Sequence, residues 1–302
     1  MNKLRKIILL MVIVTFIAFL AIWLNSRQNA YAHDFWYYSW GQHVTENSGY
    51  GENGVMPGSF GDGHDLALAI SRVLIVGGNF MLPAFFISFF IGSGYFMLRK
   101  LVRFPESIFL VAPFSLVLLI TSGSYFLFAQ MLAMGFFFLA IGFYLRDRKL
   151  PVAVCLMLMS VSHAWSAFFY LGCFGIYLLI RDRRFVLYLL PAVAIFLALM
   201  PDGMFNFLST RTSVGSNLSY LVNVQLTENI ILIPPLIYGI WILRRHKIGL
   251  LFGLIILFPL VSLAFLWSPF WSWRVVTLLP LNCFEAMGVS ALLEYIARRG
   301  GV

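Results

Sequence analysis

Residues 150–180, which read LPVAVCLMLMSVSHAWSAFFYLGCFGIYLLI, decide the predicted fold of this chain. The stretch is apolar along nearly all of its 31 residues, and basic clusters flank it at 146–149 and at 181–184. One straight helix of this length would be about 46 Å long, whereas the hydrocarbon core of a bilayer is about 30 Å thick. Because basic loops stay on the cytoplasmic side of a membrane, both ends belong on that side. We therefore predict two short helices that turn near Ser160–Ser166, although neither Pro nor Gly marks the turn.

The composition of the whole chain favours an all-α protein embedded in a membrane. Of its 302 residues, 61% are hydrophobic and only 11% are charged, whereas a soluble domain is about half apolar and a quarter charged. The net charge of +9 lies in short clusters at the ends of apolar segments, so no continuous basic face is formed and no nucleic-acid partner is expected. The three cysteines lie in apolar segments, where they are typical of small buried residues rather than of a disulfide framework: Cys155, Cys173 and Cys283.

The apolar segments and their basic flanks predict a polytopic bundle of about ten transmembrane helices with both termini cytoplasmic. All Lys and Arg residues except Arg27, Arg72, Arg211 and Arg274 fall on the predicted inner side. The chain is then one transmembrane domain, residues 1–302, with outer loops at 25–79 and 201–228. Besides the two helices of 150–180, the predicted spans are Ile7–Leu24, Phe80–Leu98, Ser107–Ile120, Phe126–Leu145, Phe185–Met200, Ile230–Leu243, Ile248–Trp267 and Val275–Ile296.

The start of the first outer loop is the first candidate for chemistry. It reads Tyr31-Ala-His-Asp-Phe-Trp-Tyr-Tyr-Ser-Trp40, and Ala30-Tyr-Ala32 before it resembles a signal-peptidase site. The 18-residue apolar run ahead of that site is long for a signal core, so we favour a retained anchor. Partial desolvation near the interface would make the Asp34 carboxylate a better acceptor for the proton of a sugar hydroxyl. An interfacial aromatic belt around a solvated acid is an equally open interpretation.

A second group of polar residues follows in the same loop, in Gly61-Asp-Gly-His-Asp65. Asp62, His64 and Asp65 could supply ligands to a divalent ion such as Mg²⁺ or Mn²⁺, with Asp34 or His33 completing the shell. The residues from His64 to Val76 also predict a short amphipathic helix at the membrane interface, which either Asp would cap. We favour capping, so the sequence does not require a metal or another cofactor.

Three further polar side chains lie near the predicted outer surface. His163, the only histidine inside an apolar segment, lies about 20 Å along its helix from Leu150. A hydrogen-bonded core histidine is one interpretation, but ionisable groups within a membrane usually mark functional sites, and we favour function. Arg211 and Arg274 could each bind a phosphate bidentately, although cation–π packing is the alternative for Arg274. Glu285 lies about 16 Å below Arg274 and is expected to form hydrogen bonds inside the bundle.

Several of these motifs together resemble the GT-C superfamily of integral membrane glycosyltransferases. They are His33-Asp34-Phe-Trp-Tyr-Tyr, the predicted interfacial helix, Ser162-His163-Ala-Trp-Ser-Ala-Phe-Phe, and Arg274 at the opening of the last helix. The resemblance implies sugar transfer from a polyprenyl-phosphate carrier to a glycan, lipid or protein acceptor on the outer face. It implies Asp34 as the base and Arg274, Arg211 and His163 as the groups that bind the donor phosphate. His33, Trp36 and Tyr37 are the expected sugar-binding residues. The loop departs from the family pattern because it lacks a clean double-acid motif.

Other classes of protein fit parts of the same pattern. Exopolysaccharide polymerases share a first-loop Asp and a segment similar to Phe128-Ala-Gln-Met-Leu-Ala, but this chain lacks the Arg that often precedes the Gln. A transporter of lipid-linked sugars would place charges at the bilayer midplane, where only Glu285 is expected here. A non-catalytic membrane subunit is the remaining alternative. We therefore expect a glycosyltransferase and keep these three as competing hypotheses.

Overall fold

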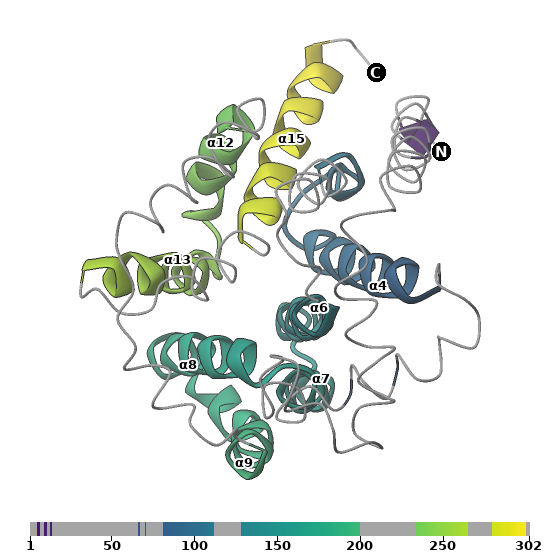
Figure 1. Ribbon diagram of the computed structural model, residues 1–302. Coiled ribbons are helices and arrows are strands. Elements are labelled where there is room, and N and C mark those ends of the chain that lie inside the picture. The colour runs from purple at the N-terminus through teal and green to yellow at the C-terminus, as the bar shows by residue number, and fades with distance from the viewer. Residues whose placement is uncertain are drawn as a thin grey trace. The chain divides into compact units, whose positions relative to one another are not determined.

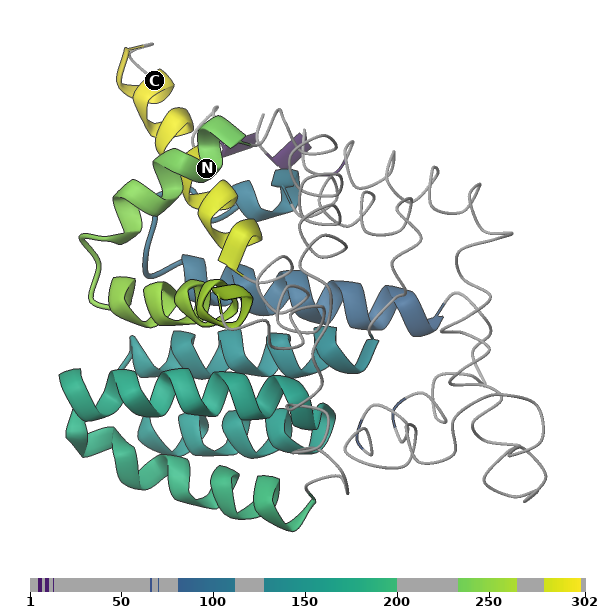
Figure 2. The same cartoon turned by 60° about the vertical axis from the view of Figure 1, so that its left-hand side comes forward.

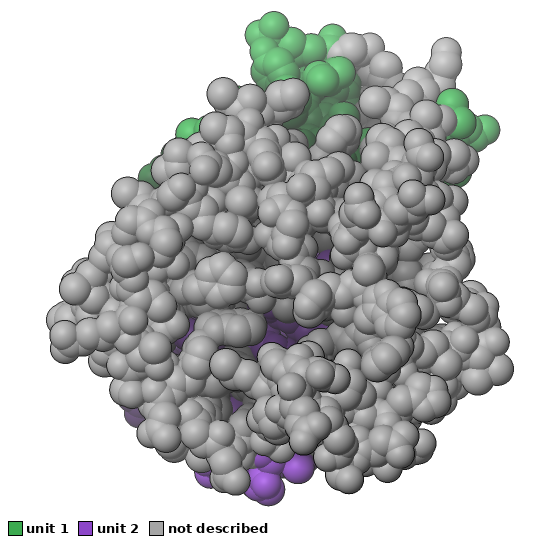
Figure 3. Space-filling model, in the orientation of Figure 1, with its two compact units in different colours: residues 1–26, 94–124, 205–302 green, residues 27–93, 125–204 purple. Residues whose placement is uncertain are grey.

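In the computed structural model, the described residues are 81–111, 128–199, 233–264 and 280–299, with isolated positions 5, 6, 9, 10, 13, 66 and 70. Within these residues the chain is helical and no residue lies in a strand (Figure 1). The chain divides into two compact units (Figure 3). Unit 1 comprises residues 1–26, 94–124 and 205–302, and unit 2 comprises residues 27–93 and 125–204. The all-α class is thus confirmed for the described part of the chain.

Unit 2 contains a group of helices that lie side by side (Figure 2). They are α6 (Phe128–Tyr144), α7 (Lys149–Ser162), α8 (Ala164–Arg181), the 3-10 helix η3 (Arg183–Leu189) and α9 (Leu190–Ala198), and most of α4 (Met81–Leu98) belongs to the same unit. Helix α6 is apolar on every face and is buried along nearly its whole length, including all residues from 129 to 134. Such an all-round apolar helix is typical of the centre of a bundle.

The long apolar stretch is divided as the sequence predicts. Helix α7 ends at Ser162 and α8 begins at Ala164, so the predicted turn within Ser160–Ser166 is confirmed. The residue between them, His163, is extended, with φ −163° and ψ 104°. The Oγ atoms of Ser160 and Ser162 donate to the carbonyl oxygens four residues earlier, at 3.0 and 2.6 Å. Serines whose hydroxyl groups donate to the carbonyl four residues earlier often bend helices. Here two such serines precede the break, and neither Pro nor Gly lies at the break.

The turn between α6 and α7 is a compact helix C-terminus. The amide of Arg148 donates to the Phe143 carbonyl and that of Asp147 to the Tyr144 carbonyl, both at 3.0 Å. This pair of bonds is the Schellman motif, which needs a left-handed residue after the helix. That residue is Asp147, whose φ is +56°. Asp tolerates this conformation better than most residues, but Gly adopts it without a steric cost.

Replacing Asp147 by Gly is expected to stabilise the protein by about 0.5–1 kcal/mol, because Gly removes the β-carbon that disfavours the left-handed conformation. Thermal unfolding of the purified protein measures this as a higher midpoint. Asp147→Ala is the matched control, because it removes the charge and keeps the β-carbon, so it should give no increase. A midpoint that rises equally in both variants would attribute the effect to charge instead.

The chain after α8 differs from the predicted helix. The sequence predicts one helix over Phe185–Met200, whereas the structure has η3 followed by α9, so the single helix is wrong. Pro191 explains the difference, because proline lacks the amide that a helix interior requires and its ring clashes with the carbonyl of the preceding turn. The structure places Pro191 in the first turn of α9, where proline is tolerated.

Unit 1 contains α12 (Ile233–Leu243), α13 (Gly249–Ala264) and α15 (Pro280–Arg299). Helices α12 and α15 approach closely because each has a buried glycine at the contact. A β-carbon on Gly239 would meet the backbone of Phe284, and one on Gly288 would meet the backbone of Pro235. These pairs are separated by four residues on each helix, so the two glycines form reciprocal contacts between antiparallel helices. Small residues at such positions allow helix backbones to approach one another.

Two serine hydrogen bonds join the residues after α4 to α15. The Phe104 amide donates to Ser290 Oγ at 3.1 Å, and Ser107 Oγ donates to the Ala286 carbonyl at 2.6 Å. Both serines are buried, so these bonds satisfy polar groups that would otherwise be costly inside unit 1. Helix α15 therefore contacts both α12 and the segment around residues 104–107.

The other predicted elements stand as follows. Among the residues that the structure describes, no helix combines the length and apolarity needed to cross a membrane. The arrangement of about ten spans therefore stays a prediction. One part of it is wrong: the layout has α12 and α15 both running inward to their basic ends, whereas the structure packs these two helices antiparallel. Of the two predicted outer loops, only Leu66 and Ile70 are described, and both are helical. The interfacial helix His64–Val76 otherwise lies outside the described residues.

Candidate functional site

His163 is the one sequence-predicted site residue that lies within the described part of the structure. The catalytic, phosphate-binding, sugar-binding and metal-binding candidates from the loops lie outside the described residues: Asp34, Arg211, Arg274, His33, Trp36, Tyr37, Asp62, His64 and Asp65. Within the described residues, no group of three or more His, Cys, Asp or Glu side chains is placed to hold a metal ion. The metal interpretation of the first loop therefore stays a prediction.

His163 connects two helices and is buried, with only 4% of its surface exposed. Its amide donates to the Met159 carbonyl at 3.3 Å, which completes α7. Its carbonyl accepts from the Ala167 amide at 3.0 Å, which begins α8. Its side chain caps α8, because Nδ1 accepts from the Ser166 amide at 3.1 Å and lies 2.9 Å from Ser166 Oγ. His163 thus has the structural role of an N-cap, a position that Ser, Thr, Asp and Asn usually occupy.

The cap fixes the protonation pattern of the imidazole ring. A backbone amide can only donate a hydrogen bond, so Nδ1 must be unprotonated where it accepts from Ser166. In the neutral ring the proton then resides on Nε2, which is a donor. The capped ring is therefore uncharged, with an acceptor at Nδ1 and a donor at Nε2.

The end of unit 2 that contains His163 is polar and uncharged in its described part. Ser162 and Ser166 are buried beside the break between α7 and α8, and Ser160 Oγ, one turn earlier, also donates to the Ala192 carbonyl of α9 at 3.1 Å. Gln130, in the first turn of α6, is 2% exposed. Sequence reasoning noted Gln130 only as part of a motif, and it missed Ser166 as the partner of the histidine.

Among the described residues of unit 2, a cluster of charged and tyrosine side chains lies at the opposite end of α8. Asp182 is 7% exposed and pairs with Arg184 at 3.2 Å, and the hydroxyl groups of Tyr144 and Tyr177 lie 3.1 Å apart. Helix α8 has 18 residues, so about 27 Å separates this end from His163. The histidine is therefore remote from the basic turns, as the predicted topology requires of an outer site.

Glu285, the other ionisable residue expected inside the bundle, is 3% exposed in α15 of unit 1. Its burial agrees with the interior position that the sequence predicts.

Two substitutions of His163 distinguish its role as the N-cap of α8 from a role of its Nε2 atom as a hydrogen-bond donor. Asn places a side-chain oxygen close to the position of Nδ1 and is a good N-cap, so His163→Asn should keep the stability of the protein. Gln extends beyond the cap position, so His163→Gln should cost about 1 kcal/mol of stability, as the loss of a cap typically does. If Nε2 contacts a substrate, we expect His163→Asn to lower the enzymatic activity while the thermal midpoint stays unchanged. Full activity of a stable His163→Asn would assign the residue to capping alone.

His163 with its serine partners is the described part of the candidate site, and the loop residues around Asp34 remain the predicted part. Comparisons with models of protein families, with curated proteins and with solved structures find no match for this chain.

Proposed function

We propose that this chain is a membrane glycosyltransferase that moves a sugar from a polyprenyl-phosphate donor to an acceptor on the extracytoplasmic face. The observation that supports the proposal most is the buried histidine at the break between two apolar helices, about 27 Å from the basic end of α8. A polar, water-poor end beside the outer leaflet suits a reaction in which one substrate stays in the bilayer. The acceptor is a glycan, lipid or protein hydroxyl or amide group.

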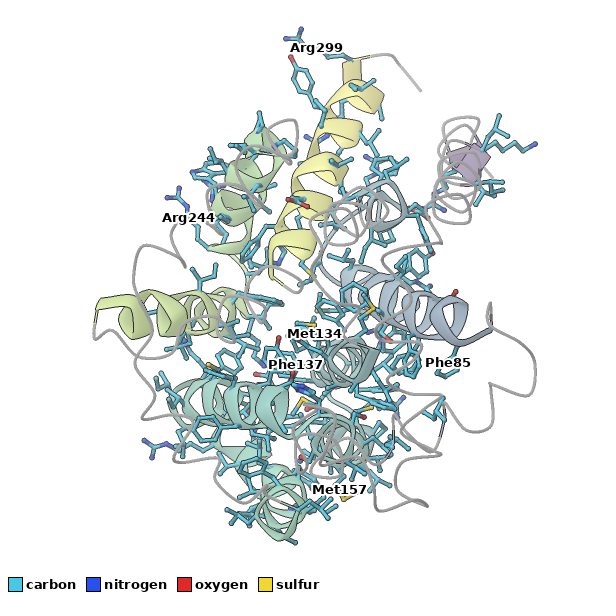
Figure 4. All side chains as sticks on the ribbon, in the orientation of Figure 1. Phe85, Met134, Phe137, Met157, Arg244 and Arg299 are labelled. Atoms are coloured by element: carbon cyan, nitrogen blue, oxygen red, sulfur yellow. The ribbon has the colours of Figure 1, made fainter. Side chains whose placement is uncertain are left out.

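Features of the helix ends and surfaces support a membrane setting. Large apolar side chains are exposed on several helices, as expected of surfaces that face lipid: Leu150, Ile180, Leu187, Leu197 and Ile237. Basic side chains lie over aromatic rings near helix ends, with Arg245 4.3 Å and Arg244 5.0 Å from the Trp241 ring centre. Figure 4 shows Arg244 and Arg299 at the ends of their helices. Paired aromatic and basic residues are typical of membrane–water interfaces.

Each predicted site residue has a distinct task in this reaction. Asp34 accepts the proton of the acceptor group as the sugar is transferred. Arg274 and Arg211 stabilise the negative charge that develops on the departing polyprenyl phosphate, which we expect to be the larger energetic contribution. His163 donates one neutral hydrogen bond, and His33, Trp36 and Tyr37 contact the sugar or acceptor.

A transfer assay in proteoliposomes tests the proposal. The purified chain is reconstituted with polyprenyl-phosphate hexoses and candidate acceptors, and the release of polyprenyl phosphate is measured by mass spectrometry. Release that depends on the acceptor is the expected result. If the protein instead moves the intact lipid-linked sugar between leaflets without release, the chain is a transporter and the enzymatic proposal fails.

A further inference from the structure

The contacts between α6 and α8 have a regular register. Tyr144 and Tyr177 join their hydroxyl groups at 3.1 Å, and the rings of Phe137 and Tyr170 stack with centres 4.5 Å apart. In both pairs the residues are 33 positions apart, so the two helices run parallel with a constant offset. Successive pairs are seven residues apart, which is about two helical turns or 10.5 Å. Figure 4 labels Phe137 on α6, in the middle of this series.

One further step of seven residues reaches Gln130 on α6 and His163 at the start of α8. The same offset of 33 therefore places these two residues at one level, above the stacked pair of Phe137 and Tyr170. The hairpin of α6 and α7 agrees, because Gln130 lies 17 residues before Asp147 and His163 lies 16 residues after it. Two polar side chains thus occupy the level at which the aromatic series would otherwise continue.

Gln130 is unusual among the buried polar residues at this end of unit 2. It is 2% exposed, and its Oε1 accepts no hydrogen bond from any residue that the structure describes. A buried acceptor without a donor destabilises a folded protein, and most native buried polar groups have partners. An amide retained at such a cost is a candidate for binding a ligand that supplies the donor. A ligand hydroxyl group has the required O–H.

The surroundings determine which kind of ligand fits. The other buried polar groups at this level are the neutral His163 ring and the hydroxyl groups of Ser162 and Ser166. The buried charged residues of the described chain lie elsewhere: Asp182 is at the far end of α8 and Glu285 is in unit 1. A phosphate needs cations or several positive dipoles, whereas a neutral compound with several hydroxyl groups matches uncharged donors and acceptors.

We propose that Gln130, at the level of His163, binds the neutral, polyhydroxylated part of a ligand, with a ligand hydroxyl donating to Gln130 Oε1. The identification of this ligand as a sugar rests on the proposed function. Gln130 is a binding residue in this account, and it makes no covalent step.

Binding and stability together test the proposal on the full chain in lipid nanodiscs. The probes are methyl β-D-glucopyranoside, methyl β-D-galactopyranoside and methyl α-D-mannopyranoside, observed by saturation-transfer NMR. We expect the wild type to transfer saturation to at least one of them, and Gln130→Leu to reduce that signal at least fivefold. Because Leu removes the Oε1 atom that lacks a donor among the described residues, we also expect Gln130→Leu to raise the thermal midpoint of the unliganded protein. Met131→Leu, a buried neighbour on α6, should change neither quantity.

Three results overturn the proposal. If no probe receives saturation from the wild type, or if Gln130→Leu keeps the signal, Gln130 does not bind a sugar. If Gln130→Leu loses stability together with the signal, the amide is structural, and Gln130→Met, which keeps an unbranched side chain, checks whether the shape of Leu caused the loss. Probe binding without any transfer activity would leave this site standing while the proposed glycosyltransferase falls.

Discussion

Replacing Asp34 by Asn is expected to lower the rate of sugar transfer by about 10²–10⁴-fold, the typical contribution of a general base. Asn has nearly the same shape as Asp but cannot accept the acceptor proton at neutral pH. Because the substitution keeps the size of the side chain, the thermal midpoint should not fall. The measurement is initial release of polyprenyl phosphate by the purified variant in proteoliposomes.

A second acid in the same predicted loop provides the control. Glu46→Gln removes an equal charge from the first outer loop but is not assigned a role, so it should retain activity within about twofold. Equal losses in both variants would indicate that the loop needs negative charge in general. Unchanged transfer by Asp34→Asn would remove Asp34 from the mechanism and with it the main residue of the proposed site.

The second large effect concerns the contact between α12 and α15. Gly239→Ala is expected to destabilise unit 1 by about 1–3 kcal/mol, the usual cost of overpacking, because its β-carbon would overlap the Phe284 backbone. A backbone cannot rotate away as a flexible side chain can, so the helices must separate. Gly288→Ala, which meets the Pro235 backbone, should have a similar effect. Unfolding in mixed detergent micelles gives the change in the free energy of unfolding.

Gly253 supplies a matched control in the same unit. It lies within α13, and a β-carbon at this position would meet no atom within 4 Å. Gly253→Ala should therefore leave stability unchanged or raise it by up to about 1 kcal/mol, as expected for Gly→Ala in a helix. Because both glycines act on one helix contact, the double variant of Gly239 and Gly288 should cost less than the two single changes added. Stability close to wild type in Gly239→Ala would contradict the close approach of the helices.

The helices and their ends were largely predictable because their signals are local. Basic residues mark the ends of apolar segments, so α4, α6, α12 and α13 begin and end within a few residues of the predicted spans. The break at His163 was predictable from the length of the apolar stretch and from the basic clusters at both of its ends. Its structural cause, a histidine cap with serines that bond back to their own helix, needed the observed geometry.

The features that escaped prediction depend on contacts between distant segments. Gly239 and Gly288 are 49 positions apart, and nothing in either local sequence shows that one faces the other helix. The burial of Gln130 follows from α6 being surrounded on all sides, which an apolar pattern without a polar face only suggests. The spacing of 33 between equivalent residues of α6 and α8 was present in the sequence, but it becomes informative only when the helices are known to be parallel.

We expect Asp34 and His163 to belong to one site that opens to the outer leaflet. An experimental structure with polyprenyl phosphate bound would locate both side chains. We expect the Asp34 carboxylate, the His163 ring and an outer arginine to lie around one lipid-open cavity and within about 15 Å of one another, since catalytic contacts need about 3 Å or a bridging water. An Asp34 carboxylate in open water, with no groove leading from it to the bilayer, would exclude such a shared site.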